Sequence, residues 1–205
     1  MKLYYHPASP NCIPVLALAD HLGLELERIF TDPFKGETRT PEYLKNNPNG
    51  KVPTLVDGDY VVWESNAIMI YLADQNETSL WPRDMKTRVS IIHWQFWQQA
   101  HWLHATGILT WERLIKSFAD LGDPDPAEEK KGEEAVERYG AVLNASLEGK
   151  QYLVGDQLTL ADFAVASPLV YAEPCRFPLK DFSHLHAWYA RISELEAWQK
   201  NLPSM

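Results

Sequence analysis

The chain has 205 residues, of which 45% are hydrophobic and 23% charged, a composition typical of a folded globular protein rather than a disordered one. Its formal net charge of -9 disfavours an extended nucleic-acid surface, because such surfaces depend on clustered Lys and Arg. Two cysteines cannot form a framework of disulfides. The sequence also shows neither a secretory leader pattern nor an apolar run of the roughly 20 residues that cross a bilayer. We therefore expect a cytoplasmic protein with no nucleic-acid or membrane partner.

The first 77 residues alternate short strand patterns with helical ones, which is typical of an α/β domain. A strand is predicted from Lys2 to Tyr5. Apolar residues at helical spacing follow from Ile13 to Leu22, until Gly23 ends the run. A second strand is predicted from Leu26 to Thr31, followed by a polar loop. The pattern so far predicts a βαβ unit.

Two antiparallel strands and a helix are expected to complete this domain. The strands run from Thr54 to Asp57 and from Tyr60 to Trp63, and the Gly58-Asp59 pair between them has the chemistry of a tight hairpin turn. An apolar helical run follows, with Ser65 as its expected N-cap. The predicted fold of this half is βαβ-ββα with a mixed four-stranded sheet.

The remainder of the chain is predicted to be wholly helical. A polar stretch without periodicity separates the two halves, so we expect a linker over 78–85 and an all-α domain over 86–205. Long helices are predicted from Met85 to Phe118 and from Ala127 to Leu147. Further helices are expected from Thr159 and from about Asp181.

A hydroxyl and a thiol stand where the first strand gives way to the first helix. Backbone N–H groups and the helix dipole stabilise anions there, so a thiolate beside Ser9 would be favoured. The alternative is that Ser9 or Asn11 simply caps the helix. Cys12 has the spacing of a Cys-x-x-Cys pair whose first and reactive cysteine is replaced by Ser9. We therefore expect Cys12 to be a small buried apolar residue.

Two further segments have the chemistry to bind a peptide. Pro53 heads a predicted strand, and a cis bond after Val52 would turn the backbone of Val52 toward an extended peptide. The trans alternative is the more frequent one. Ser65, which follows Glu64, lies at a second strand-to-helix junction, where a hydroxyl and free N–H groups can bind a carboxylate. Plain helix capping explains Ser65 equally well.

These motifs, in this order and at these separations, resemble the glutathione transferase family over nearly the whole chain. The segments that carry the resemblance are Asn47 to Leu55, Trp63 to Ile68 and Gly155 to Asp162. In the last segment Thr159 is expected to cap a helix while Asp162 reaches back to it. The resemblance implies a thioredoxin-like, glutathione-binding N-terminal domain, an all-α C-terminal domain and a homodimer.

The resemblance also implies how the sulfur end of glutathione is bound. Ser9 matches the serine that donates a hydrogen bond to the glutathione sulfur in the delta, theta and phi-like classes. Asn11 is a rival or partner for this contact, because some disulfide-reducing relatives use a Thr or Asn nearby. Val52, ahead of a cis Pro53, is expected to pair its backbone with the cysteinyl part.

The two ends of glutathione are assigned in the same way. Ser65 and Glu64 are expected to hold the carboxylate and the ammonium of the γ-glutamyl end, with Asn66 beside them. Lys51 could reach the glycyl carboxylate. The sequence departs from the family at two places, because Asn66 stands where several serine-type classes have Arg and Gly50 stands where some have a glycyl-binding His.

The second substrate is expected between the loop at 6–9 and the helical domain. Trp94 and the aromatic residues and histidines that follow it along the long helix are spaced by 3, 4, 3 and 7 residues, which predicts a single stripe. Such a stripe is also typical of a core or a dimer interface. Its two histidines have no third ligand at convincing spacing, so no metal is predicted. The expected electrophile pocket comprises His6, Pro7, Trp97, His101, His104 and Trp111.

Three functions remain open at this point. The first is a detoxifying transferase that joins glutathione, as co-substrate, to a small hydrophobic electrophile. The second is glutathione-dependent reduction of a disulfide or peroxide, with Ser9 or Asn11 orienting the sulfur. The third is a binding protein that has kept the fold and lost activity. The intact set of Ser9, Val52-Pro53 and Glu64-Ser65 argues against the third.

Overall fold

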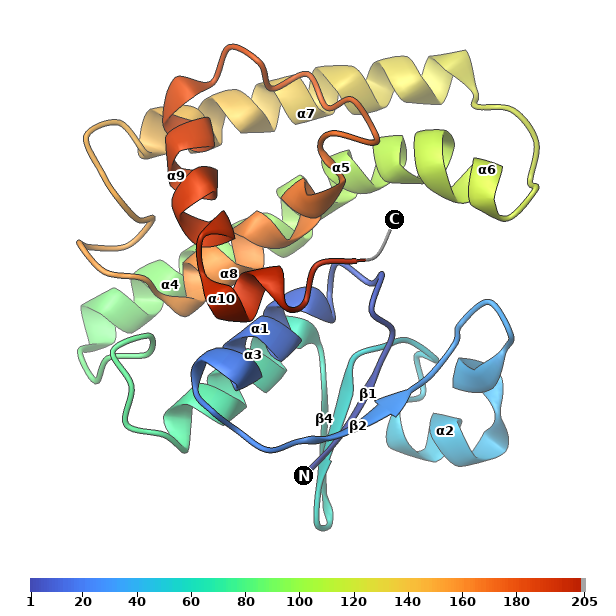
Figure 1. Ribbon diagram of the computed structural model, residues 1–205, viewed down its shortest axis with the longest axis vertical. Helices are drawn as coiled ribbons and strands as arrows, with labels where there is room; N and C mark the ends of the chain where they lie inside the picture. The colour runs from blue at the N-terminus through green and yellow to red at the C-terminus, as the bar shows by residue number, and fades with distance from the viewer. Residues whose placement is uncertain (204–205) are drawn as a thin grey trace. The chain divides into compact units, whose positions relative to one another are not determined.

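The computed structural model describes residues 1–203, and these form two compact units (Figure 1). The first unit contains residues 1–82 together with the C-terminal segment from residue 193, and the second contains residues 83–192. The division falls inside the expected linker at 78–85. The C-terminal segment, which we expected in the helical domain, packs on the first unit. Among the described residues, no helix is both long and apolar enough to span a membrane.

The first unit is built on a four-stranded mixed sheet with the order β2-β1-β3-β4. β1 pairs with β2 in parallel, and the other neighbours are antiparallel. The predicted α/β fold class is confirmed. The strands are β1 (Lys2–Tyr5), β2 (Glu27–Phe30), β3 (Thr54–Asp57) and β4 (Tyr60–Trp63).

Two helices pack against each other beside this sheet, α1 (Ile13–His21) and α3 (Ser65–Asp74). α1 is apolar on nearly all sides, and its residues from Ile13 to Ala19 are all buried. α2 (Pro41–Asn46) lies across the sheet from them (Figure 1), after the short 3-10 turn η1 (Glu37–Arg39).

The expectation of a polar loop in place of α2 is wrong. Thr40 caps this helix by accepting a hydrogen bond from the Tyr43 backbone N–H at 3.2 Å. Pro41 occupies the first turn, where no hydrogen bond is lost. α2 has only six residues and buries one of them, Tyr43, so it leaves no apolar periodicity in the sequence.

The end of the chain is attached to the first unit by a polar cluster. α10 (Glu196–Gln199) packs on α1. Asp20, at the end of α1, accepts a hydrogen bond from Asn201 Nδ2 at 2.7 Å and forms an ion pair with Arg28 of β2. Burial acts to raise the pKa of Asp20, but the hydrogen bonds from Asn201 and Arg28 and the nearby charges hold it below its usual value.

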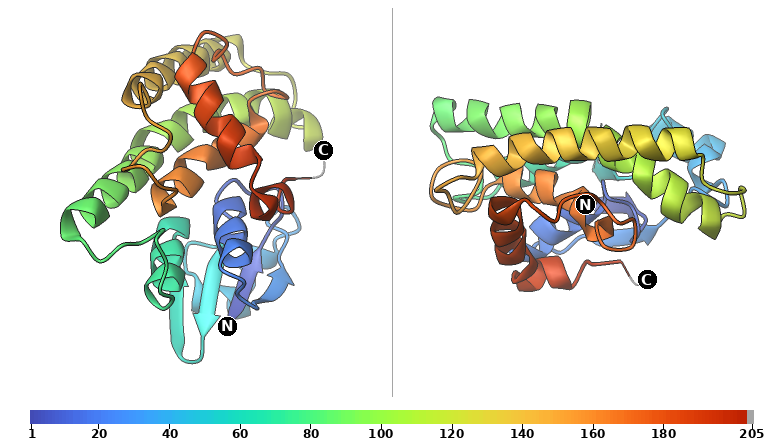
Figure 2. Two further views of the ribbon diagram at one scale, coloured as in Figure 1. Left: turned by 60° about the vertical axis from the view of Figure 1, so that its left-hand side comes forward. Right: turned by 90° about the horizontal axis from the view of Figure 1, so that it is seen from above.

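The second unit is organised around one long helix with an antiparallel partner (Figure 2). The long helix covers the predicted span, but two π-helical turns interrupt it, each of which adds a residue to a turn. α7 (Pro126–Ser146) packs along its middle part. The segments of the long helix are α4 (Met85–Trp97), η2 (Gln98–Trp102), α5 (Leu103–Thr110), η3 (Trp111–Ile115) and α6 (Lys116–Phe118).

The core of the second unit contains α8 (Leu160–Ala166), in which every residue is buried. The predicted capping box is present, and Asp162 Oδ2 accepts the Thr159 backbone N–H at 2.8 Å. Asp162 Oδ1 accepts Trp188 Nε1 at 2.9 Å, which ties α8 to α9 (Ser183–Ser193). Burial raises the pKa of Asp162, and these hydrogen bonds act in the opposite direction. The 3-10 turn η4 (Ser167–Tyr171) continues α8.

Candidate functional site

The register of the sheet brings three predicted segments to one end of it. Tyr4 of β1 lies opposite Thr54 of β3, and Thr54 lies opposite Trp63 of β4. The chain therefore leaves β1 toward Ser9, enters β3 through Pro53 and leaves β4 into Glu64 at the same end of the sheet. We call this end, which carries residues 6–12, 50–53 and 64–66, the Tyr4 end of the sheet.

The side chain of Ser9 does not cap α1. The N-cap position is occupied by Cys12, and no side chain caps the helix, so the capping alternative for Ser9 and Asn11 is wrong. Instead, Ser9 closes a tight turn in which its backbone N–H donates to His6 O at 3.0 Å and its carbonyl accepts Cys12 N–H at 2.9 Å. Ser9 and Asn11 are both half-buried. The Ser9 hydroxyl thus stands at a helix N-terminus without a capping role.

Cys12 is a protonated thiol in the core of the first unit. It is fully buried, as expected from the sequence. Burial raises the pKa of Cys12 to about 12, although hydrogen bonds with the His6 backbone and the Ser9 side chain act in the opposite direction. Because the thiolate is the reactive form, Cys12 is not the nucleophile at this end of the sheet.

The peptide bond between Val52 and Pro53 is cis. The carbonyl of the preceding residue, Lys51, accepts hydrogen bonds from Tyr43 Oη at 2.6 Å and from Asn47 Nδ2 at 2.8 Å. A trans peptide unit holds its C=O and N–H on opposite sides. Because the Lys51 carbonyl points toward Tyr43 and Asn47, the N–H of Val52 in the same peptide unit points away from them. Neither backbone group of Val52 makes a hydrogen bond within residues 1–203.

Buried polar groups hold this loop in place. Tyr43 Oη and Asn47 Nδ2 each lie 2.9 Å from Thr54 Oγ1, and all three residues are at most 5% exposed. Burial raises the pKa of Tyr43, so its phenol stays protonated and able to donate. No sequence pattern indicates a role for Tyr43 or for the Asn47 side chain. The Asn-Pro-Asn-Gly motif marked the loop, but no local pattern linked it to Tyr43.

Glu64 and Ser65 form the third part of the site. Glu64 is the N-cap of α3 with φ 72° and ψ 117°, a backbone conformation that non-glycine residues rarely adopt and that clusters at functional sites. Ser65 is the first helical residue, so its expected N-cap role is wrong by one position. Its hydroxyl makes no hydrogen bond within the described part of the chain. Asn66 is the second residue of α3, and the Lys51 side chain is exposed.

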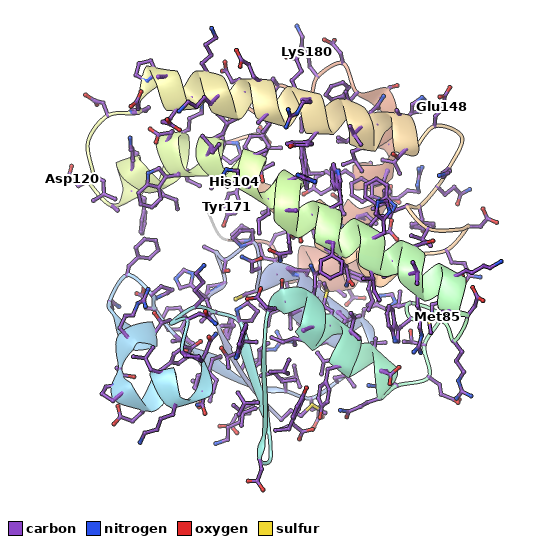
Figure 3. The ribbon with its side chains drawn as sticks, turned by 180° about the vertical axis from the view of Figure 1, so that it is seen from behind. Met85, His104, Asp120, Glu148, Tyr171 and Lys180 are labelled. Atoms are coloured by element: carbon purple, nitrogen blue, oxygen red, sulfur yellow. The ribbon has the colours of Figure 1, made fainter. Side chains whose placement is uncertain are left out.

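The predicted electrophile residues of the second unit do not form one stripe. His104 lies near the middle of the long helix that runs from Met85 toward Asp120 (Figure 3). It lines a cavity of about 300 Å³ together with Leu103, Gly107, Ile108, Trp111, Glu112 and Glu128. Trp97 and His101 instead contact Tyr139 of α7, with ring centroids 6.2 and 5.2 Å away. The π-helical turn between Trp97 and His104 explains this separation, because it breaks the 3.6-residue period.

The two remaining candidates belong to the first unit. The His6 ring packs near two exposed phenylalanines, with its centroid 5.4 Å from that of Phe30 and 6.4 Å from that of Phe34, and Pro7 is exposed. His6 Nδ1 accepts the Ala8 backbone N–H at 3.3 Å, which fixes the ring beside the Ser9 turn. Among the described residues, no group of three His, Cys, Asp or Glu could hold a metal ion.

Comparison with known proteins identifies the family. Residues 1–74 match the glutathione S-transferase N-terminal domain and residues 103–196 match the glutathione S-transferase C-terminal domain. The chain belongs to the glutathione S-transferase family.

Solved structures agree with this assignment. The theta class glutathione S-transferase from Xanthomonas axonopodis pv. citri, solved with glutathione bound, is 28% identical with a TM-score of 0.90, over 100% of this chain and 97% of that one. A delta-class glutathione transferase from Nilaparvata lugens is 30% identical with a TM-score of 0.82, over 98% and 92%. A glutathione S-transferase from Pseudomonas fluorescens is 29% identical with a TM-score of 0.86, over 96% of each chain.

Proposed function

We propose that this protein is a cytoplasmic glutathione transferase that joins the glutathione thiolate to a small hydrophobic electrophile. The observation that carries the proposal is the arrangement at the Tyr4 end of the sheet. There the Ser9 hydroxyl, which has no capping role, lies at the start of α1, at the same end of the sheet as the free backbone groups of Val52. A donor for sulfur and a template for a peptide are both needed to bind a thiol tripeptide.

The polar groups of glutathione have complementary partners at the Tyr4 end of the sheet. Its cysteinyl N–H and C=O can pair with the backbone of Val52. The γ-glutamyl carboxylate can accept hydrogen bonds from the Ser65 hydroxyl and from the N-terminus of α3, which favours anions. The γ-glutamyl ammonium can pair with Glu64, which forms no salt bridge among the described residues.

Ser9 contributes to the reaction by favouring the anionic form of sulfur. A hydrogen bond donated to a thiolate lowers the pKa of the thiol, so more of the bound glutathione is reactive at neutral pH. The thiol proton goes to solvent. The thiolate then attacks the electrophilic carbon, so that a C–S bond forms and the leaving group departs with the electron pair of its former bond. No protein side chain needs to form a covalent bond.

Isothermal titration with reduced glutathione and, in parallel, with its disulfide tests the proposal before an electrophile is known. Tighter binding of the reduced form supports the transferase, and a screen of electrophiles follows. Preference for the disulfide would point instead to reduction. If neither form binds, the proposal of an enzyme is wrong and a binding protein without activity is favoured.

We further propose that the protein is a homodimer. Met85, Val89 and Phe96 lie on α4 at spacings of 4 and 7 residues and are 71%, 56% and 71% exposed. Large apolar side chains on one helix face favour association. Sedimentation should give twice the 23.5 kDa of one chain, and Phe96→Glu should shift the protein toward the monomer.

A further inference from the structure

We infer that His6 is a positioning residue for Ser9: its neutral ring holds the turn that presents the Ser9 hydroxyl, and protonation of the ring releases that turn. This inference rests on the proposed transferase function and makes His6 the group through which pH controls the reaction. The sequence places His6 among the expected electrophile residues, whereas its polar contacts in the structure are with the Ser9 turn.

His6 binds two successive N–H groups of this turn. Its ring nitrogen Nδ1 accepts the Ala8 backbone N–H at 3.3 Å, and its carbonyl accepts the Ser9 backbone N–H at 3.0 Å. On the other side of the turn, the Ser9 carbonyl accepts the N–H groups of Cys12 at 2.9 Å and Ile13 at 3.1 Å. The backbone of Ser9 is thus held both by His6 and by the start of α1. Of these contacts, the one made by the His6 ring can be removed by a proton.

The ring contact requires a neutral imidazole. Nδ1 can accept a hydrogen bond only when the single ring proton is on Nε2. In the imidazolium both ring nitrogens carry protons, so Nδ1–H would face the Ala8 N–H and two donors would meet. Histidine is the side chain that ordinarily changes charge between about pH 5 and 8. We therefore expect the hydrogen bond to Ala8 to be lost as the pH falls through this range.

The charged groups around the ring offer the protonated form another partner. The ring packs near β2 and the loop at 31–36, and the charged residues of that loop are Asp32 and Lys35. Asp32 interacts electrostatically with the ring and with Lys35, 3.6 Å away, and its backbone N–H donates to Glu37 Oε2 at 2.6 Å. On β2, Glu27 and Arg28 pair with other residues of the unit. A carboxylate accepts several donors, so the protonated ring can turn toward Asp32.

Release of the turn leaves the Ser9 hydroxyl without a fixed position, and the glutathione thiolate then loses its donor. The unmodified protein should therefore lose activity at acidic pH for two reasons, which are protonation of the bound thiol and protonation of His6. His6→Asn separates them. The oxygen of an Asn side chain can accept the N–H two residues further on, as in an Asx turn, and it does not titrate. This variant should keep the turn at every pH.

Conjugation of glutathione to a chromogenic aryl halide tests this consequence, with kcat/KM measured from about pH 8 to about pH 5.5. The ratio of kcat/KM for His6→Asn to that for the unmodified protein should be about one at the upper pH and about three to ten at the lower, as expected for one recovered hydrogen bond. His6→Leu, which removes the acceptor, should be about three- to tenfold less active at the upper pH. His184→Asn replaces an exposed histidine of α9 and is the matched control, which should follow the unmodified protein throughout.

Amide NMR of the protein without substrate tests the hydrogen bond itself. The Ala8 N–H resonance should shift as His6 titrates and should lose this shift in His6→Asn, while the rest of the spectrum shows whether each variant is folded. An Ala8 resonance that does not respond to His6, equal pH profiles of His6→Asn and the unmodified protein, or full activity of folded His6→Leu would overturn the inference. If the unmodified protein neither binds nor conjugates glutathione, the proposed function fails, and an Ala8 resonance that follows His6 would still support the hold of His6 on the Ser9 turn.

Discussion

At the residue scale, the conformation of the loop at 51–53 depends on two buried side chains of neighbouring segments. Tyr43 and Asn47 both donate to the Lys51 carbonyl and so fix the orientation of the next peptide unit. These groups are buried, where an unmade hydrogen bond is costly. The hydrogen bonds from Tyr43 and Asn47 therefore set the direction of the free N–H of Val52. We regard Tyr43 and Asn47 as positioning residues.

Tyr43→Phe should weaken glutathione binding and change the chemical step little. Loss of the hydroxyl frees the Lys51 peptide unit to rotate, so we expect KM for glutathione to rise about three- to tenfold while kcat stays within about twofold. The free energy of unfolding should fall by about 1 kcal/mol. Steady-state kinetics with glutathione as the varied substrate, together with urea denaturation, measures both effects.

Tyr71→Phe is the matched control for this change. Tyr71 Oη donates to Asp57 Oδ2 at 2.8 Å, and Asp57 lies at the hairpin end of β3, away from Pro53. This variant should lose comparable stability and keep the KM for glutathione. If both variants raise KM equally, the effect of Tyr43 is only structural and its positioning role is wrong.

At the element scale, the glycines of α7 allow close packing in the second unit. A Cβ on Gly140 would lie 2.7 Å from both Leu179 Cδ2 and Phe182 Cε2, which belong to the segment between η4 and α9. Glycine costs helix stability, so its presence in the middle of α7 is explained by this approach. The contact sets the distance between α7 and that segment.

Gly140→Ala should destabilise the protein by about 1–3 kcal/mol, because the added methyl group overpacks the contact. Gly107→Ala is the opposite case, since nothing lies within 4 Å of a Cβ placed there, and it should stabilise the protein by about 0.5–1 kcal/mol. Chemical denaturation of both variants measures this difference. A stabilising Gly140→Ala would contradict the packing account.

Elements with strong local signals were predictable and others were not. β3 and β4 have the predicted bounds because their Gly58-Asp59 turn is specified by adjacent residues. α2 is too short to show periodicity. The π-helical turns of the long helix depend on packing, so the predicted stripe from Trp94 to Trp111 divides between the Tyr139 contact and the cavity at His104.

At the scale of the whole molecule, the chain returns to the first unit at its end. Asp20, Arg28 and Asn201 are separated by up to 181 residues in sequence and form one polar cluster. The contact of Arg39 with Gly50 is likewise set by the fold. Sequence patterns report neighbours along an element, and they therefore point to Ser9, Val52 and Ser65 as candidates but not to Tyr43 or to the role of the Asn47 side chain.

The Asp20 cluster should make stability depend on acidic pH. The pKa of Asp20 is lower in the folded protein than its usual value of about 3.9, so its contribution is fully present above that value and is lost as pH falls through the folded-state pKa. Asp20→Asn should cost about 0.5–1 kcal/mol at pH 7, a modest value because solvent screens the pair. Urea denaturation should show the gap between variant and unmodified protein closing below about pH 4. A gap that is constant from pH 7 to pH 3 would contradict this account.

The most direct test of the proposed function is the pH titration of the glutathione thiol bound to the unmodified protein and to Ser9→Ala, followed by thiolate absorbance. Glutathione bound to the unmodified protein should have a thiol pKa well below the value of about 8.5 for a free thiol. In Ser9→Ala that pKa should rise by about one to two pH units, as expected for loss of a hydrogen bond to a charged group, and the affinity for glutathione should fall most at pH values above the bound pKa, where the thiolate is the bound form. The same titration curve for both proteins would contradict the account, because Ser9 would then have no part in forming the thiolate.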